Sequence, residues 1–173
     1  MENIQFKPKV NLTIIVKDEN GNIINKIERQ NDPLTRWALR SLYSFMTEQY
    51  TSIKFEDGRV IPVQFTNAPI GWMVKIAIGT DATPFTMDDY RLYNKEREKS
   101  ITIGYYKEED STLWFDLKSD FFIEKDMVYY EFGLFGHHRD LVFLVCRDVI
   151  DTGVSVPANN YLSVIYRIIL GTV

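Results

Sequence analysis

The sequence predicts a mainly β fold, an antiparallel β-sandwich of jelly-roll-like character with one amphipathic helix at about residues 33–50. Short apolar segments recur along the chain with turn-forming residues between them, which is typical of antiparallel sandwiches. The chain also contains 10 Tyr and 11 Phe, and aromatic residues favour strands. A parallel sheet would need a crossover helix between successive strands, and only one segment has the pattern of a good helix.

Length and composition indicate one globular domain that spans residues 1–173. Hydrophobic residues make up 45% of the chain and charged residues 25%, which argues against a disordered tail, a collagen-like rod or a coiled coil. The formal net charge is −4, whereas binding nucleic acid through many phosphate contacts needs a clustered basic surface. We therefore expect no direct contact with nucleic acid.

The first predicted element is a β-hairpin. Its first strand has an apolar residue at every second position: Val10, Leu12, Ile14 and Val16. The Asn20-Gly21 dipeptide is a strong turn signal because both residues tolerate positive φ, and residues 23–28 form the return strand. Three residues of this turn also have the spacing of a calcium loop: Asp18, Asn20 and Asn22. Ile23 stands where that loop requires glycine, so we interpret the segment as a hairpin turn.

Residues 33–50 form the one convincing helix. Asp32 suits the N-cap, and Pro33 suits the first helical position, where its missing N–H costs little. Apolar residues recur at helical spacing on one face: Leu34, Trp37, Ala38, Leu42, Phe45, Met46 and Tyr50. The opposite face is polar: Arg36, Arg40, Ser44 and Glu48.

The rest of the chain is predicted to be strands and one long connection. A strand over residues 60–65 contains Pro62, which restricts it to a sheet edge. The next strand, 74–78, ends at Gly79, and a long polar connection follows over residues 80–98. The remaining strands are 101–106, 113–121, 128–135, 141–147 and 161–170.

The common signatures of catalytic and cofactor sites are missing from the sequence. It has no glycine-rich phosphate loop, no His-Glu-x-x-His, no paired Cys-x-x-Cys and no Gly-x-Ser-x-Gly. His137 and His138 are adjacent in a predicted turn, and neighbours on a strand point in opposite directions, so we do not expect them to share a metal. Cys146 lies in an apolar run and is predicted to be a buried small hydrophobe. We therefore expect a non-enzymatic protein without cofactor or metal.

The sequence also predicts a protein that does not enter a membrane. Residues 1–6 lack the basic region and apolar run of a secretory signal. No apolar run approaches the ~20 residues that a membrane helix needs. We expect synthesis in a reducing cytoplasm.

One charged residue stands out inside a predicted strand. Glu131 is the only charge within residues 128–135, where alternation places it on one face with Tyr129, Gly133 and Phe135. A buried carboxylate without a partner is costly. The next strand offers a cation, either Arg147 or Arg139. We predict a structural ion pair between Glu131 and Arg147, with Arg139 as the alternative partner.

Four segments in the second part of the chain form a recognisable order. They are Ile76-Ala77-Ile78-Gly79-Thr80-Asp81, Tyr130-Glu131-Phe132-Gly133-Leu134-Phe135, Cys146-Arg147-Asp148-Val149 and Val154-Ser155-Val156-Pro157-Ala158-Asn159-Asn160-Tyr161. This order resembles small β-sandwich structural proteins of tailed bacteriophages and archaeal viruses, which occur in tails, baseplates, fibres and capsid turrets. The N-terminal strand, hairpin and helix are similar too, so the resemblance covers most of residues 10–170.

The resemblance implies a non-enzymatic subunit that is repeated in a virion and made in the host cytoplasm. Its partners would be copies of itself and other virion proteins, and it would form a homo-oligomer. We expect the connection at residues 80–99 and both termini to carry the contacts. The candidate assembly residues in that connection are Asp88, Asp89, Arg91 and Tyr93.

A carbohydrate- or receptor-binding module is the alternative function. Aromatic side chains stack on sugar rings, and the candidates for that role are Trp72 and Trp114. Aromatic residues also fill sandwich cores, so their presence alone does not decide between the two functions.

Overall fold

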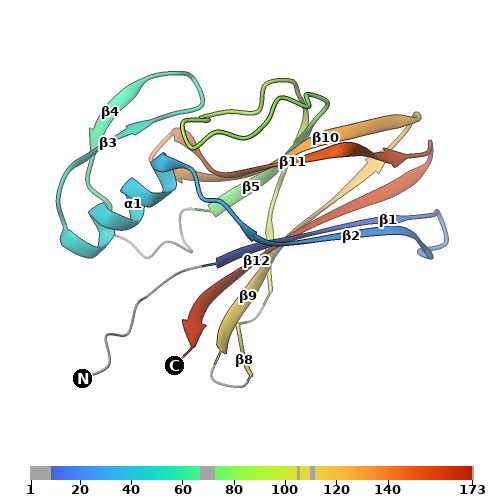
Figure 1. Cartoon of the computed structure of the whole chain (residues 1–173), viewed down its shortest axis with the longest axis horizontal. Helices are drawn as coiled ribbons and strands as arrows, with labels where there is room; N and C mark the ends of the chain where they lie inside the picture. Colours follow the sequence, from blue (N-terminus) through green and yellow to red (C-terminus); the bar gives the residue numbers. More distant parts are fainter. Residues whose placement is uncertain (1–8, 67–72, 105, 110–111, 173) are drawn as a thin grey trace.

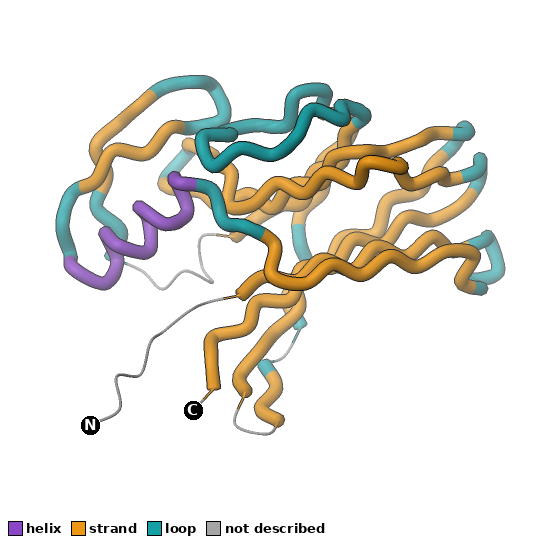
Figure 2. Tube along the Cα trace, in the orientation of Figure 1, coloured by secondary structure: helices purple, strands orange, loops and turns teal. Residues whose placement is uncertain are grey.

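Two antiparallel β-sheets face each other in the computed structural model, which describes residues 9–66, 73–104, 106–109 and 112–172 (Figures 1 and 2). Sheet A contains, in spatial order, β2 (Ile23–Asp32), β1 (Lys9–Lys17), β12 (Asn160–Thr172), β9 (Thr112–Ile123) and β7 (Thr102–Ile103), with β8 (Lys107–Glu109) also paired to β9. Sheet B contains β11 (Leu141–Val156), β10 (Met127–His138), β5 (Met73–Gly79) and β6 (Lys95–Ser100). The predicted fold class, a mainly β antiparallel sandwich with one helix, is confirmed.

The core lies between the two sheets. Alternate residues of β1 point inward as predicted and are buried: Val10, Leu12, Ile14 and Val16. They meet inward residues of β12 and β9, and aromatic side chains from sheet B such as Tyr129 and Phe132 close the layer from the other side. Each fully buried side chain of this size contributes about 1.5–3 kcal/mol, which explains why the alternating segments dominate the fold.

The β1–β2 turn confirms the hairpin interpretation. Asp18 Oδ1 accepts hydrogen bonds from the backbone N–H groups of Asn20 (2.9 Å) and Asn22 (2.8 Å). Gly21 adopts a φ of +86°, a conformation that side chains with a Cβ rarely adopt. The Asp18 carboxylate therefore stabilises the hairpin turn by accepting hydrogen bonds from it.

Helix α1 (Arg36–Thr47) is shorter than the predicted helix and begins later. Thr35, not Asp32, is the N-cap, and its Oγ1 accepts from the Ala38 N–H at 3.2 Å. The Thr35 N–H donates to the Val145 carbonyl and its hydroxyl to the Leu144 carbonyl, at 2.9 and 2.6 Å. The start of the helix is thus set by docking onto β11, a long-range contact that the local capping signal does not contain. Asp32 is instead the last residue of β2.

The predicted apolar face of the helix is also only partly right. Ser44 is buried, although it was placed on the polar face, because its hydroxyl donates to the Gln49 carbonyl and accepts from the Phe65 N–H. Met46 and Tyr50 were assigned to the core face but are 67% and 71% exposed. The C-terminal end of α1 lies away from sheets A and B (Figure 1), and Tyr50 follows that end, so neither side chain reaches the core. Helix α1 has 12 residues, and no helix in the described part of the chain is long and apolar enough to cross a membrane.

Several strands depart from the prediction. The predicted 101–106 strand contains β7, which spans only Thr102–Ile103, and β8 was not predicted. The predicted 60–65 strand is β4 (Val60–Val63), which pairs with β3 (Thr51–Lys54) in a separate two-stranded sheet, where Pro62 is tolerated at an edge. Strand β3 was not predicted. Strand β6 begins inside the predicted 80–98 connection and extends past its end to Ser100. Its sequence, KEREKS, is charged because it is an exposed edge strand, so it has no apolar alternation to detect.

The faces of β10 change at a bulge. Alternation predicted Tyr129 and Glu131 on one face, but the pairing register with β11 shifts between these two residues. Tyr129 therefore points into the main core together with Phe132 and Leu134. Glu131 and Phe135 stay on the outer face of sheet B, which is the face that carries the candidate site.

Candidate functional site

The loop of residues 80–94 joins β5 to β6 and lies over the outer face of sheet B (Figures 1 and 2). Beneath it is a small apolar cluster, separate from the main core: Ala77, Leu92, Phe135 and Leu144. Leu92 comes from the loop, and the other three come from β5, β10 and β11. The loop is therefore packed onto the sheet.

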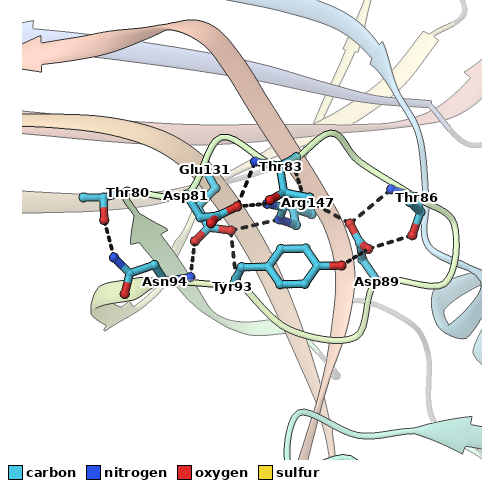
Figure 3. Close-up of polar contacts among 9 residues, drawn as sticks. All are labelled: Thr80, Asp81, Thr83, Thr86, Asp89, Tyr93, Asn94, Glu131 and Arg147. Atoms are coloured by element: carbon cyan, nitrogen blue, oxygen red, sulfur yellow. Dashed lines mark hydrogen bonds and ion pairs between the residues drawn. The ribbon is translucent and has the colours of Figure 1, made fainter.

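Arg147 on β11 holds this loop through three carboxylates (Figure 3). Its Nε lies 2.9 Å from Glu131 Oε2, and its Nη1 lies 3.1 Å from Asp89 Oδ2. Its Nη2 lies 3.6 Å from Asp81 Oδ1. The structure thus brings together Glu131 and Arg147, the two residues predicted to pair, and both side chains are fully buried. We call these residues, together with Tyr93, the Arg147 clamp.

The Glu131 carboxylate binds backbone N–H groups at the end of the loop. Its Oε2 accepts from the Tyr93 N–H at 3.0 Å, and its Oε1 accepts from the Asn94 N–H at 2.7 Å. Hydrogen bonds that involve an ionised group are about twice as strong as neutral ones. Arg139, the alternative partner, lies in the β10–β11 turn.

Asp89 closes the middle of the loop. Its carboxylate accepts from the Thr86 N–H (3.1 Å) and the Thr86 hydroxyl (2.7 Å). The Tyr93 hydroxyl donates to the same group at 3.1 Å, and the Tyr93 ring covers the Arg147 guanidinium at 4.6 Å. Burial and the neighbouring Asp89 charge raise the pKa of Tyr93. The Tyr93 ring therefore covers the Arg147 guanidinium, and its hydroxyl stays protonated at neutral pH.

Two glycines make room for the clamp. A Cβ on Gly79 would lie 2.5 Å from both the Asn94 carbonyl oxygen and Glu131 Oε1. A Cβ on Gly133 would lie 2.9 Å from Leu92 Cδ2. The close approach of loop and sheet therefore requires glycine at position 79, where a Cβ would meet backbone, whereas a Cβ at position 133 would displace the end of the Leu92 side chain.

The ion pairs and hydrogen bonds of the clamp stabilise the position of the loop on sheet B. Asp89, Glu131 and Arg147 are buried, and the carboxylates accept from backbone or side-chain donors of the chain itself. Asp81 at the rim is half-buried, and hydrogen bonds from Thr83, followed by the charge of Arg147, lower its pKa. General acid–base catalysis needs a group that reaches a substrate, and the buried members of the clamp do not.

The predicted assembly residues do not share one environment. Asp88 is exposed and its carboxylate lies 3.1 Å from Arg36 Nε, and Arg91 is exposed as well. Tyr93 is 48% exposed, so its ring both covers Arg147 and forms part of the surface. Asp89 is buried, which corrects its assignment to a contact surface, because Arg147 and Thr86 occupy its carboxylate.

A shallow groove of about 580 Å³ runs beside the clamp. It lies between the loop, the β3–β4 turn and the β10–β11 turn, and its charged lining residues are Glu56, Asp57, Arg59, Arg91, Lys95 and Asp140. Glu56 is already bound by Lys75 and Lys95, at 3.4 and 2.7 Å, and Asp57 by Arg59. The lining charges thus largely neutralise one another.

Of the two tryptophans proposed for sugar stacking, only Trp114 lies among the residues that the structure describes. Trp114 lies on the outer face of sheet A, where the Arg167 guanidinium sits 3.6 Å from the ring centroid and Lys107 Nζ sits 5.1 Å from it. Asp116 anchors Arg167 through bonds of 2.8 and 3.0 Å, so the cation is held on the ring. Trp72 lies outside the described residues.

A second buried polar group was missed from the sequence. Asp32 at the end of β2 and Asp148 on β11 are buried acids that influence each other's ionisation, and the Tyr166 hydroxyl donates to Asp148 Oδ2 at 3.1 Å. Burial, then the charge of Asp32, raises the pKa of Asp148 well above its ordinary value. The only available signal was an acid that directly follows an apolar strand, since the partner is distant in sequence.

The remaining site predictions concern cysteine and metal. Cys146 is fully buried, as predicted, and burial raises the pKa of its thiol. Among the residues that the structure describes, no group of three or more His, Cys, Asp or Glu side chains is arranged to hold a metal ion.

In comparisons with known proteins, no family model, curated protein or solved structure matches this chain.

Proposed function

We propose that this protein is a non-enzymatic structural subunit of a virus or phage particle, which acts by assembling with copies of itself and with other virion proteins. The proposal starts from the resemblance of its strand and turn motifs to small sandwich proteins of such particles. A β-sandwich alone supports many functions, so the argument rests on the clamped loop.

The observation that carries the proposal is the buried ion pair beneath residues 80–94. Arg147 and Glu131 are fully buried and bind the loop at the Thr83 carbonyl and at the Tyr93 and Asn94 N–H groups. The exposed side chains of the loop therefore project from a fixed backbone. A preordered surface binds a partner without the cost of ordering a loop, which suits repeated assembly of identical contacts.

The exposed part of the loop has the composition of a contact surface. Met87 is 47% exposed and Tyr93 48%, and Arg91 of the same loop is exposed as well. Methionine, tyrosine and arginine are enriched at protein interfaces. The Asp89 and Glu131 carboxylates beneath them are committed to internal bonds, which favours a binding surface over a catalytic one.

The test is the solution mass by light scattering over a concentration series. We expect a discrete oligomer, and we expect Met87→Asp and Arg91→Glu to weaken it at least tenfold in concentration. Lys125→Glu, in the exposed β9–β10 turn, is the matched charge-reversal control and should leave the mass unchanged. A wild-type chain that stays monomeric at all concentrations contradicts self-assembly. Binding of that monomer to a glycan array would support the carbohydrate alternative.

A further inference from the structure

Strand β2 is a long free edge of sheet A. It spans Ile23–Asp32, pairs only with β1 and occupies the end of the sheet order (Figure 1). Every residue except Asp32 is exposed or half-buried. Among the strands that the structure describes, none pairs with its outer side. An edge of this kind presents a row of backbone N–H and C=O groups that can pair with another chain.

The other edges of the sandwich are covered or poorly suited to pair with themselves. The β11 edge is covered over residues 142–146, by a bridge from Leu34 to Cys146 and by the Glu56 N–H on the Val142 carbonyl, and Arg29 occupies its Val149 carbonyl. Strands β7 and β8 have two and three residues.

Strand β6 carries a charge pattern that opposes self-pairing. Antiparallel pairing about its central Arg97 would place Lys95 opposite Lys99 and Glu96 opposite Glu98 in the second copy. Like charges directly opposite each other destabilise a sheet. In addition, Arg97 and Lys99 bind the carbonyls of Phe122 and Asp120 in sheet A, which covers this side of the sandwich.

We propose that two copies of this chain pair through β2, antiparallel, about a two-fold axis that passes at Ile27. A two-fold contact is self-complementary, so each residue must suit the residue that faces it in the second copy. In this register Lys26 faces Glu28 of the second copy, and Glu28 faces its Lys26. Asn25 faces Arg29. The inference rests on the proposed function, because it names the first contact by which the subunits assemble.

The charges select this register. Lys26 Nζ lies 2.5 Å from Glu28 Oε1 in the same chain, and both side chains are largely solvent-exposed, at 48% and 60%. Pairing at Ile27 therefore forms a square in which the four charges alternate in sign. Moving the axis by one residue would place Lys26 against Lys26 or Glu28 against Glu28, and both arrangements are repulsive. The result joins the two copies of sheet A into one continuous sheet.

The first test is a charge swap followed by light scattering. Lys26→Glu and Glu28→Lys each create like-charge contacts across the axis, and we expect each to raise the dimer dissociation constant at least tenfold. The double variant Lys26→Glu/Glu28→Lys restores opposite charges and should recover the wild-type constant. Both residues are exposed, so the fold is expected to tolerate these changes. Single variants that dimerise like the wild type would overturn the proposal.

The second test maps the axis by disulfide formation. Ile27→Cys lies on the axis, where the two Cα atoms come within disulfide range, and should give a covalent dimer on oxidation. Ile24→Cys is the matched control: Ile24 is 53% exposed, yet the two copies of it lie about 20 Å apart in this register. Cys146 is fully buried and should not cross-link. A covalent dimer from Ile24→Cys and none from Ile27→Cys would overturn the register.

The two proposals fail in distinguishable ways. Suppose that the Lys26 and Glu28 variants leave the dissociation constant of the oligomer unchanged, whereas Arg91→Glu raises it. That result would overturn the β2 pairing but would still support assembly as the function. A monomer in every arm would overturn both.

Discussion

Asp148 shows how a single buried residue can couple stability to pH. Its carboxyl is buried beside that of Asp32, and burial followed by the Asp32 charge raises the pKa of Asp148 well above its ordinary value. Because the folded pKa is raised, its contribution is fully present below the unfolded pKa of about 3.9. That contribution is lost as the pH rises through the folded pKa.

We therefore expect Asp148→Asn to be more stable than the wild type at pH 8, by more than about 1 kcal/mol, and to lose this advantage towards pH 4. The amide can donate to Asp32 and accept from Tyr166 without titrating. The measurement is urea unfolding of both chains between pH 4 and 8. An advantage that does not change with pH would show that Asp148 does not titrate in this range.

Asp120→Asn is the control with the opposite sign. Burial opposes ionisation of Asp120, but the bonds from Ser163 and Lys118 lower its pKa overall. Its contribution is present above the unfolded pKa and lost as the pH falls through the folded pKa. This variant should therefore be less stable than the wild type at neutral pH and approach it in acid.

At the scale of the element, the Arg147 clamp makes the 80–94 loop part of sheet B. Removing one partner of a buried pair leaves an uncompensated charge and typically costs 3–5 kcal/mol. Glu131→Gln keeps the shape, but its amide NH2 faces donors that the carboxylate accepted from Tyr93, Asn94 and Arg147. We expect a loss of about 3 kcal/mol in unfolding free energy and new protease cleavage within the loop.

An exposed pair gives the matched comparison for Glu131→Gln. Asp57 and Arg59 are bonded in the β3–β4 turn, with side chains 44% and 61% exposed. Solvent screens such an exposed pair, so Asp57→Asn should barely change the unfolding free energy. If Glu131→Gln costs no more than Asp57→Asn and leaves the loop resistant to protease, the loop is not held by the clamp.

At the scale of the whole molecule, the sequence predicts what alternation encodes and misses what depends on distant contacts. The two-faced strand β1 was predictable because one face is buried, and so was the partner of Glu131, a lone charge in an apolar strand. Strand β6 was not, because an exposed edge strand has no apolar face. The Asp32–Asp148 pair and the start of helix α1 depend on how the chain crosses from β2 to β11, and no local pattern records that path.

The two sides of the sandwich are each bridged by an arginine that binds a carbonyl of the opposite sheet. Arg29 on β2 donates to the Val149 carbonyl at 2.9 Å, and Arg97 on β6 donates to the Phe122 carbonyl at 2.9 Å. These bridges lie at opposite edges, separated by the strands between β2 and β9, or about 14 Å. Sites that far apart contribute additively when the molecule unfolds as one unit.

We therefore expect Arg29→Met and Arg97→Met to cost about 1 kcal/mol each in unfolding free energy, and the double variant to cost their sum within about 0.5 kcal/mol. Urea unfolding at concentrations where the chain is monomeric measures all three, with fluorescence and circular dichroism as independent probes. A double variant whose two probes report different midpoints would show that the sheets separate before they unfold. In that case the bridges, rather than the core between the sheets, would be what makes the sandwich cooperative.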